Sequence, residues 1–234
     1  TSGSVTTTTP DTAFLGAWAT VNRNQFAAIT GGVITAVPTV AKEDVTTWRA
    51  GDDVINFSAY TGSITDCNIL NSLPFDAAVS SPVQVAKTLV LSSSGLMVTA
   101  NVGANGSSIT GGTLLVPDSG GLVVHQHNAD ALGILEISSR VIAAALSKSG
   151  NGELVLSGAG NVLGAVFVNE GVLRLAGGSA LSDTASVNIM ADDTAALGLT
   201  AGHTETIGRL EGGLDSRGRL IIGAGATLTI QQTD

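Results

Sequence analysis

Short apolar runs separated by small and polar residues dominate the sequence after residue 75. In "SKSGNGELVLSGAGNVLGAVFVNEGVLRLAGG" (147–178), the runs Leu154–Leu156 and Val172–Leu175 are bounded by Gly, Asn and Ser. Leu173-Arg174-Leu175 alternates in the way expected of a half-buried strand. No stretch carries a helical apolar stripe over three turns, and "VIAAALSK" (141–148) is the nearest approach. The pattern predicts an all-β chain built from many short strands.

Such short strands can form a sandwich, a barrel or a solenoid. The turns favour the solenoid, because Asn105-Gly106 and Asn151-Gly152 are the only pairs of the kind that closes two-residue hairpins. The core residues are aliphatic, which suits coils that stack about 4.8 Å apart and place like residues over like. A parallel β-helix is therefore expected, with strands at 86–92, 96–101, 111–116, 121–127, 133–138, 140–148, 152–157, 165–169, 171–177, 185–190, 195–200, 218–223 and 226–231.

The first third of the chain follows a different rule. Seven of the eight aromatic residues lie in the first 75 positions, whereas 24 of the 30 glycines follow them. Terminal units of stacked proteins are atypical because they close an otherwise open core. We therefore expect an extended Thr-rich arm at 1–12, an aromatic-containing cap with the first coils at 13–75, and the parallel β-helix at 76–234. The opening "TSGSVTTTTP" is interpreted as a mature or trimmed start.

Charge and hydropathy exclude several classes of partner. Charged residues make up 12% of the chain and the net charge is −9, so a phosphate backbone would be repelled and nucleic acid is not an expected partner. No apolar run approaches the 18 residues of a membrane span. The only lysines are Lys42, Lys87 and Lys148. A modestly acidic, lysine-poor surface suits an exported protein that must stay soluble.

The segment 146–178 resembles the autotransporter-associated β-strand repeat, also called the passenger-associated transport repeat. The matching positions are Leu146, Lys148, Gly150, Gly152, Leu154, Leu156, Ser157 and Gly158, then Val168, Gly171, Leu173 and Leu175. "VLGAVF" (162–167) replaces the usual Tyr-Thr-Gly-Gly-Thr-Thr, and looser similarity extends to 14–37 and 122–143. The resemblance implies a right-handed β-helix in a large secreted bacterial protein with a structural or surface-display role. It implies no active site, and it places the repeat residues in the core and at turns.

Three groups of residues have ligand chemistry. His125 and His127 lie two apart on one strand and could hold a metal if His203 or Asp130 joined them. Asp52-Asp53 and Asp192-Asp193 could chelate calcium. We interpret the histidines as a solvated strand face and the aspartates as turn or cap residues, so neither a metal nor a cofactor is expected.

Enzymatic and sugar-binding readings rest on few residues. A polygalacturonase-like site would draw on Asp192-Asp193, Gly202-His203-Thr204 and Arg219-Leu220-Ile221, all of them incomplete motifs. Aromatic platforms for sugar rings are scarce, since Phe167 is the only aromatic after residue 75. Trp18 and Trp48 are expected to pack in the cap with Phe14, Phe26 and Phe57, with sugar stacking as the alternative. The lone Cys67 is expected to be a buried, inert thiol, with an intermolecular bridge or a reactive thiol as the alternative.

These observations predict a non-enzymatic, extracellular β-solenoid with no catalytic residues. The expected role is a subunit of a surface or matrix filament that assembles head to tail, because "ATLTIQQTD" (226–234) has no proline or lysine to protect a strand edge. The Thr-rich arm could then add as a strand to the edge of a neighbour. The alternative is an adhesin or glycan-binding stalk that works as a monomer, and a polysaccharide lyase or hydrolase is the third class.

Overall fold

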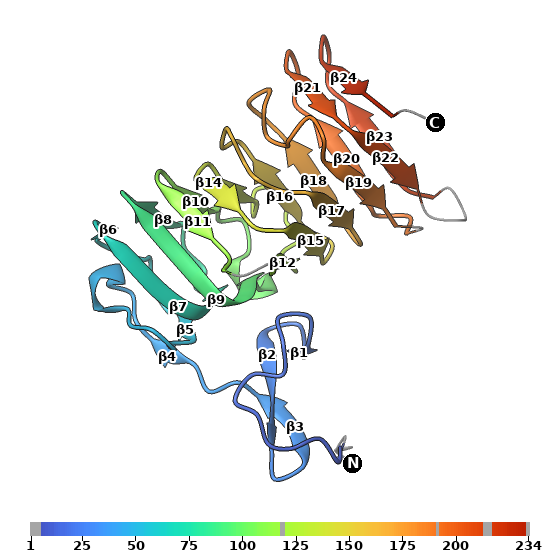
Figure 1. Cartoon of the computed structure of the whole chain (residues 1–234). Helices are drawn as coiled ribbons and strands as arrows, with labels where there is room; N and C mark the ends of the chain where they lie inside the picture. Colours follow the sequence, from blue (N-terminus) through green and yellow to red (C-terminus); the bar gives the residue numbers. More distant parts are fainter. Residues whose placement is uncertain (1–5, 118–119, 191, 213–216, 233–234) are drawn as a thin grey trace.

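The computed structural model describes residues 6–117, 120–190, 192–212 and 217–232 (Figure 1). Apart from the short 3₁₀ turns η1 (Val45–Thr47) and η2 (Ala100–Val102), every regular element in these ranges is a strand, which confirms the all-β prediction. The first strands are β1 (Thr20–Val21), β2 (Gln25–Thr30), β3 (Val33–Ala36), β4 (Val40–Ala41), β5 (Val54–Ile55), β6 (Ser63–Ile64), β7 (Cys67–Phe75), β8 (Ser81–Val85) and β9 (Thr88–Val98). The later strands are β10 (Ser107–Thr110), β11 (Thr113–Leu115), β12 (Gly121–Gln126), β13 (Leu135–Ile137), β14 (Arg140–Ile142), β15 (Ala145–Ser149), β16 (Glu153–Leu156), β17 (Ala165–Val168), β18 (Val172–Leu175), β19 (Ser186–Ile189), β20 (Ala196–Leu199), β21 (Thr204–Ile207), β22 (Arg209–Gly212), β23 (Arg219–Ile222) and β24 (Thr227–Ile230).

Two large parallel sheets form the walls of a β-solenoid. One has eight strands in the order β23-β20-β18-β16-β13-β10-β8-β6. The other has nine strands, in the order β14-β11-β9-β12-β15-β17-β19-β22 with β7 paired to β9. Each coil contributes to both walls, as with β10, β11 and β12 followed by β13, β14 and β15, so that successive coils stack along one axis (Figure 1). The predicted parallel β-helix is confirmed.

Strand lengths differ from the prediction where one long strand faces two short ones. The expected strands at 86–92 and 96–101 are a single strand, β9, which pairs with β7 along both and with β11 and β12 at its two ends. Ser93, Ser94 and Gly95 therefore continue the strand, although their composition is typical of a turn. The expected strand at 140–148 is instead two strands, because the chain turns at Ala143 and Ala144 between β14 and β15.

Rows of aliphatic side chains run through the core from coil to coil. The register places Leu135, Leu154, Leu173 and Leu197 in one inward row. A second inward row contains Ile137, Leu156, Leu175 and Leu199. All of these side chains are buried, so the inward assignment of Leu156 and Leu173 is confirmed. Burial of these rows supplies the main driving force for the stack.

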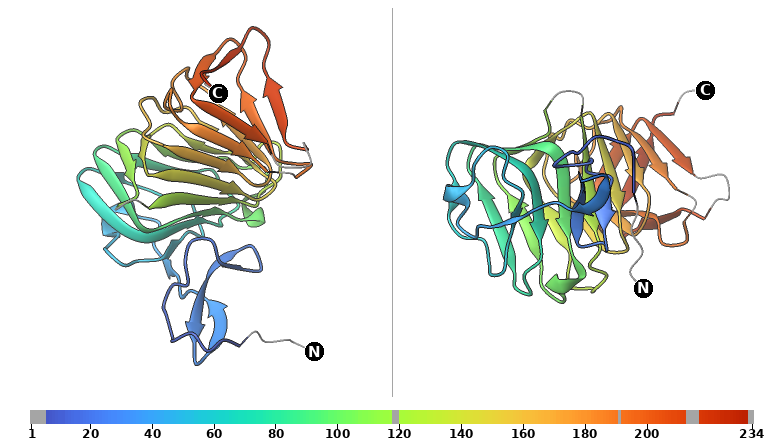
Figure 2. Two further views of the ribbon diagram at one scale, coloured as in Figure 1. Left: turned by 45° about the vertical axis from the view of Figure 1, so that its right-hand side comes forward. Right: turned by 90° about the horizontal axis from the view of Figure 1, so that it is seen from below.

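A small antiparallel sheet precedes the solenoid and lies against its side (Figure 2). Its strands pair in the order β1-β2-β3, and residues of the Thr-rich arm continue it, since Thr6 bridges to Val33 and Thr12 to Ile29. Asp11 fixes the β2–β3 turn, where its carboxylate accepts from the backbone N–H groups of Gly31 and Gly32. Residues 6–12 are thus paired within their own chain.

Several strands lie in segments that the sequence pattern did not mark. The strands β10, β21 and β22 are rich in Ser, Thr and Glu, and their parallel neighbours supply the pairing that their composition does not favour. Glu205 of β21 is buried and accepts hydrogen bonds from the backbone N–H groups of Ala180 and Leu181, both at 3.0 Å. Burial raises the pKa of Glu205, and these two hydrogen bonds oppose that effect.

Candidate functional site

Trp18 is presented to solvent on a rigid turn beside the antiparallel sheet. The turn runs from Gly16 to Ala19 and is closed by a 3.0 Å hydrogen bond from the N–H of Ala19 to the carbonyl of Gly16. Ala17 and Ala19 are buried, whereas Trp18 between them is 70% exposed. The indole lies against Gly16, whose φ is +140°, and a Cβ added there would lie 2.5 Å from Trp18 Nε1. The absence of a side chain at residue 16 therefore leaves room for the exposed indole.

The expected packing of both tryptophans is correct for one of them only. Trp48 is 4% exposed, donates from Nε1 to the carbonyl of Lys42 at 2.9 Å, and packs edge-on against Tyr60. Trp18 and Phe57 are exposed, so the expectation that they pack in a cap was wrong. Composition alone could not predict which tryptophan is buried. The two differ in their place in the fold, because Trp18 lies at the tip of a turn whereas Trp48 packs against Tyr60.

The two histidines of β12 and its continuation lie beneath the antiparallel sheet. His125 is buried, and its Nε2 lies 2.7 Å from the carbonyl oxygen of Ala17. The ring of His127 stacks on that of His125 with centroids 5.5 Å apart and an interplanar angle of 22°. The interpretation of this pair as a solvated strand face was wrong, because the antiparallel sheet covers it.

Neither histidine site has the partners of a metal centre. Burial lowers the pKa of His125 and lowers that of His127 to about 4. Asp130 is used in its own turn, where Oδ1 accepts from the N–H of Leu132 at 2.9 Å, and His203 accepts from the N–H of Gly177 near the other end of the solenoid. Within the described ranges, no group of three or more His, Cys, Asp or Glu residues is placed to hold a metal ion.

Lys148 occupies an inward position in the solenoid. The register places it between Val124 and Val168 in a row of buried side chains. Its Nζ donates to the carbonyl oxygens of Gly150 at 2.5 Å, Glu170 at 2.8 Å and Ser149 at 3.2 Å. Burial lowers the pKa of Lys148 to about 7, while the nearby carboxylates of Glu170 and Glu153 favour the charged form. The ammonium group ties two coils together through backbone carbonyls.

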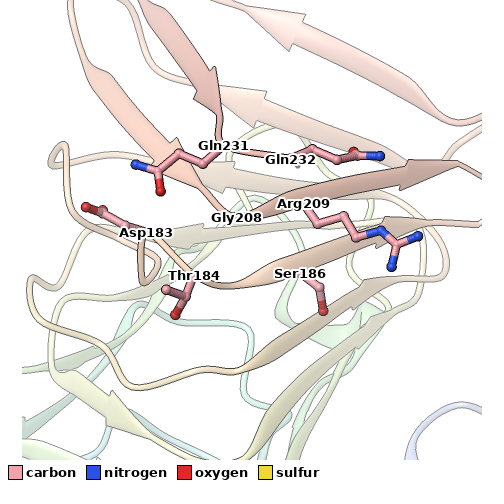
Figure 3. A pocket seen from close by; sticks show the side chains of 7 residues that line it. All are labelled: Asp183, Thr184, Ser186, Gly208, Arg209, Gln231 and Gln232. Carbon is pink, nitrogen blue, oxygen red and sulfur yellow. The ribbon is translucent and has the colours of Figure 1, made fainter. Parts of the chain in front are cut away.

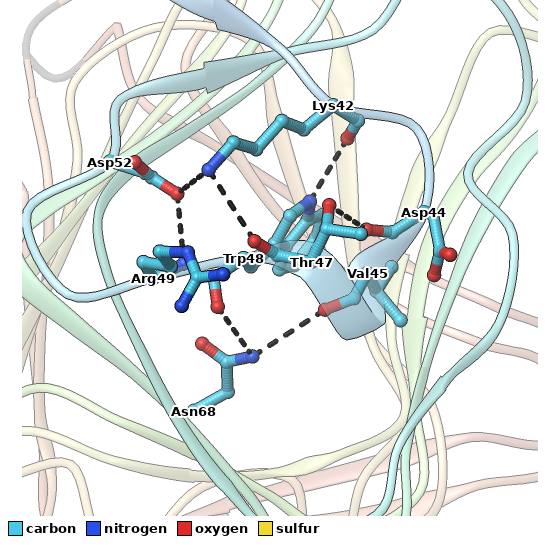
Figure 4. A network of polar contacts seen from close by, with 8 residues as sticks. All are labelled: Lys42, Asp44, Val45, Thr47, Trp48, Arg49, Asp52 and Asn68. Carbon is cyan, nitrogen blue, oxygen red and sulfur yellow. Dashed lines mark hydrogen bonds and ion pairs between the residues drawn. The ribbon is translucent and has the colours of Figure 1, made fainter.

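Asp52, one member of the first aspartate pair, is part of a polar network around η1 (Figure 4). Asp52 accepts from Lys42 Nζ at 2.5 Å and from the N–H of Arg49 at 2.8 Å, as Figure 4 shows. Burial acts to raise the pKa of Asp52, but these donors lower it below its usual range. Lys42 therefore pairs with the carboxylate of Asp52, which the sequence analysis considered as a calcium ligand.

Asp53 points elsewhere and is buried. Asn71 Nδ2 donates to both of its carboxylate oxygens, at 2.9 and 2.8 Å, and the hydroxyl of Ser72 donates to Oδ1. Burial raises the pKa of Asp53 against these hydrogen bonds. Its partners lie on the adjacent strand β7, so this carboxylate connects neighbouring coils.

The residues considered for polysaccharide cleavage do not form one site. Asp192 caps its own turn by accepting from Thr194 N at 2.8 Å and Thr194 Oγ1 at 2.5 Å, which lowers its pKa. Asp193 lies 3.8 Å from Arg217. Asp192 and His203 lie at opposite ends of β20, which separates them by a strand of four residues, about 13 Å. Arg219 begins β23 in the following coil.

A cleft of about 750 Å³ lies near the carboxyl-terminal coils (Figure 3). Among the described residues it is lined by Asp183, Thr184, Ser186, Gly208, Arg209, Gln231 and Gln232. Arg209 is paired with Glu211 at 2.8 Å. The lining contributes one carboxylate, whereas hydrolysis of a glycosidic bond needs two that flank it. The cleft has the polar groups to bind a ligand but lacks the acid and base for that reaction.

Two remaining residues also differ from or refine the expectations. Cys67, expected to be buried, is exposed at the start of β7 and free. Phe167 is 41% exposed on the outward face of β17.

In the described part of the chain, no helix has the length and apolar character needed to cross a bilayer.

Comparison with known proteins gives one informative similarity. The chain is 32% identical over 181 residues to the adhesin BmaC autotransporter of Brucella suis biovar 1 (strain 1330). The match covers 73% of this chain but 5% of that relative, so the chain corresponds to a small part of its length. No family model matches the chain, and no solved structure matches it. The β-solenoid described above is thus similar in sequence to part of an autotransporter adhesin.

Proposed function

We propose that this chain is a non-enzymatic segment of a surface-exposed autotransporter adhesin, in which the solenoid serves as a stalk. The observation that supports this proposal is the stacked parallel solenoid in a chain that is 32% identical to an autotransporter adhesin. The proposed location is extracellular or at the cell surface. The segment 146–178, which resembles the autotransporter-associated repeat, supplies core leucines and the buried Lys148, which are structural positions.

Trp18 is the residue we propose as the adhesive contact. Binding hot spots are enriched in Trp because one rigid ring removes a large apolar area from water. The indole is 70% exposed and lies against Gly16, so most of its ring is open to a binding partner. A glycan or a protein surface could bind such a ring, and the test distinguishes them.

The test uses beads coated with the purified chain and a monolayer of host epithelial cells. Trp18→Ala is expected to reduce bead attachment by at least tenfold, while Phe57→Ala, which removes another exposed aromatic ring, leaves attachment unchanged. Equal losses in both variants would indicate non-specific hydrophobic adhesion and refute the assignment to Trp18. Periodate or glycosidase treatment of the cells abolishes attachment for a glycan receptor, whereas protease treatment does so for a protein receptor.

Head-to-tail assembly into filaments is a second proposal, supported by the apolar edge formed by the last described coil. Leu220 and Ile222 continue the inward rows from Leu197 and Leu199, yet both are exposed, as is Ile230. Such an edge can accept a further strand, either from a second copy, as this second proposal holds, or from an adjoining coil of the longer adhesin proposed above. Because residues 6–12 pair within their own sheet, we assign the contact to this edge rather than to donation of the arm.

Sedimentation velocity at increasing concentration tests the assembly. Oligomers are expected that persist in 1 M NaCl, since apolar contacts and backbone hydrogen bonds are insensitive to screening. Ile222→Lys should dissolve them, while Phe167→Lys on the outward face of β17 should not. A wild-type chain that remains monomeric at high concentration would exclude assembly and leave the stalk.

The non-enzymatic assignment is tested separately. Incubation with acidic polysaccharides is expected to release neither reducing ends nor unsaturated products, because Asp192, His203 and Arg219 are dispersed over different ends of different strands. Release of either product would revive the lyase or hydrolase alternative.

A further inference from the structure

The antiparallel sheet is attached to the solenoid through a small core of its own. Phe26 and Ala28 of β2 pack with Ala17 and Val37 against Met97 of β9. The ring of Phe26 lies directly over Gly95, where an added Cβ would be 2.8 Å from Phe26 Cζ. This core is small beside that of the solenoid, so modest changes at the interface can shift the equilibrium between attached and released sheet.

His125 and His127 lie at this interface. His125 Nε2 is 2.7 Å from the carbonyl oxygen of Ala17, and its ring packs edge-on against Phe26 with centroids 6.0 Å apart. His127 stacks on His125, and both of its ring nitrogens are buried without a hydrogen-bond partner among the described residues. The neutral ring of His127 therefore leaves both of its nitrogens without hydrogen bonds. If the ring were protonated, it would also carry a buried charge without a partner, which is less stable still.

The charged groups that face the pair are cationic. Arg23, in the turn between β1 and β2, acts on His127 from the sheet side. Lys148 of β15 acts on both histidines from the solenoid side. The carboxylates that act on Lys148 are engaged elsewhere: Glu170 accepts from the N–H of Gly150, and Glu153 is paired with Arg174. Protonation of either ring would therefore add a charge beside like charges, and among the described residues no carboxylate contributes to the pKa shift of either ring.

We propose that the stacked pair of His125 and His127 is a pH-sensitive latch that releases the amino-terminal antiparallel sheet from the solenoid in mildly acidic surroundings. Release would carry the Trp18 turn away from the solenoid, because the Ala17 carbonyl that faces His125 belongs to that turn. The latch does not depend on the adhesive role proposed for Trp18.

The direction and size of the effect follow from proton linkage. The pKa of His127 is lowered to about 4 when the sheet is attached and returns toward 6.5 when the ring meets water. The released state therefore holds the proton more strongly, so attachment is complete above pH 6.5 and weakens as pH falls toward 4. For His127 alone, the attachment equilibrium weakens by at most about 30-fold between pH 7.5 and pH 5.0, because the ring is only partly buried. The pKa of His125 is lowered as well, which acts in the same direction.

Amide hydrogen exchange at pH 7.5 and pH 5.0, with each rate divided by its intrinsic rate, tests the latch. Peptides within 13–37 should lose protection at pH 5.0, by up to about 30-fold, while those within 153–199 keep theirs. His127→Gln and His127→Phe should each abolish most of this pH dependence, whereas His203→Gln, which removes a histidine far from the sheet, should retain it. Gly95→Ala serves as the released reference, with low protection in 13–37 at both pH values.

Three results would overturn the proposal. They are equal protection of 13–37 at both pH values in the wild type, a loss that spreads evenly over the solenoid, or full pH dependence in both His127 variants. Amide protection of residues 153–199 shows whether each variant is folded. If one of the two His127 variants is misfolded, the other is used for the test.

Discussion

Lys148 makes the stability of the solenoid depend on pH. The side chain is fully buried between Val124 and Val168, and its pKa falls from 10.5 to about 7 because burial disfavours the ammonium form. Since the folded pKa lies below the unfolded one, the unfolded chain holds the proton more strongly between pH 7 and 10.5. The contribution of Lys148 to the free energy of unfolding is therefore most favourable above pH 10.5, and it becomes less favourable as pH falls toward 7.

The magnitude follows from the two pKa values. Between pH 7 and pH 9 the linkage relation gives an increase of about 2 kcal/mol in the free energy of unfolding. The three carbonyl oxygens around Nζ favour the charged form, so this is an upper value. Tyr60, whose buried hydroxyl has a pKa raised well above 10, adds no slope in this window.

Urea denaturation at pH 7, 8 and 9 measures the effect in wild type and Lys148→Met. Met fills the same row with an unbranched apolar chain but cannot titrate. We expect the wild type to gain stability toward pH 9 and the variant to show a flat profile over the same range. Identical slopes for the two proteins would refute the argument that Lys148 is the titrating group.

Four other predictions address the core, the outer face, metal binding and the free thiol. Leu173→Ala should cost about 2–5 kcal/mol because it leaves a cavity in an inward row, as measured by urea denaturation. Arg174→Gln should cost no more than about 1 kcal/mol, because the ion pair with Glu153 is partly exposed, and a larger loss would mean that this pair is a core interaction. Melting temperatures in EDTA, calcium and zinc should agree, whereas a metal at a hundred times its dissociation constant would add about 2.7 kcal/mol. Cys67 should react completely with a thiol reagent in the native state, since it is exposed, and slow labelling would contradict its position at the strand start.

Much of the solenoid could be predicted because its coils repeat a local pattern. Alternation marked Leu173 and Leu175 as inward residues, and the resemblance to the repeat placed Leu154 and Leu156 in the core. Stacking of similar coils made each of them part of a row. Strand boundaries were harder to predict, because β9 is one strand only through its pairing with β7, which runs over Thr88–Leu91 and again over Gly95–Val98. Ser93 and Ser94 have turn composition and lie at the register shift between these two paired stretches, where Ser94 has a φ of +66°.

The histidine interface could not be predicted because its partners are far apart in sequence. His125 lies 108 residues from Ala17, and nothing in the alternation of β12 shows that a separate sheet covers its outward face. The same applies to Trp18 and Trp48, which have similar local composition. One ring packs against Tyr60 and the other is exposed on the turn that begins at Gly16.

Buried polar side chains explain how coils of unequal length can stack without leaving backbone groups unpaired. Regular strands satisfy their own backbone through parallel pairing, but corners do not. At these corners Lys148 donates to carbonyls, Glu205 accepts from the N–H groups of two residues, and Asn161 Nδ2 donates to the carbonyls of Gly158 and Ala180. Each of these side chains forms a hydrogen bond to a neighbouring coil. At the corners they therefore pair backbone groups between coils, as the hydrogen bonds between parallel strands do in the walls. The stack can therefore vary its turns while the aliphatic rows stay in register, and contacts with other molecules can be assigned to features outside it, such as the Trp18 turn.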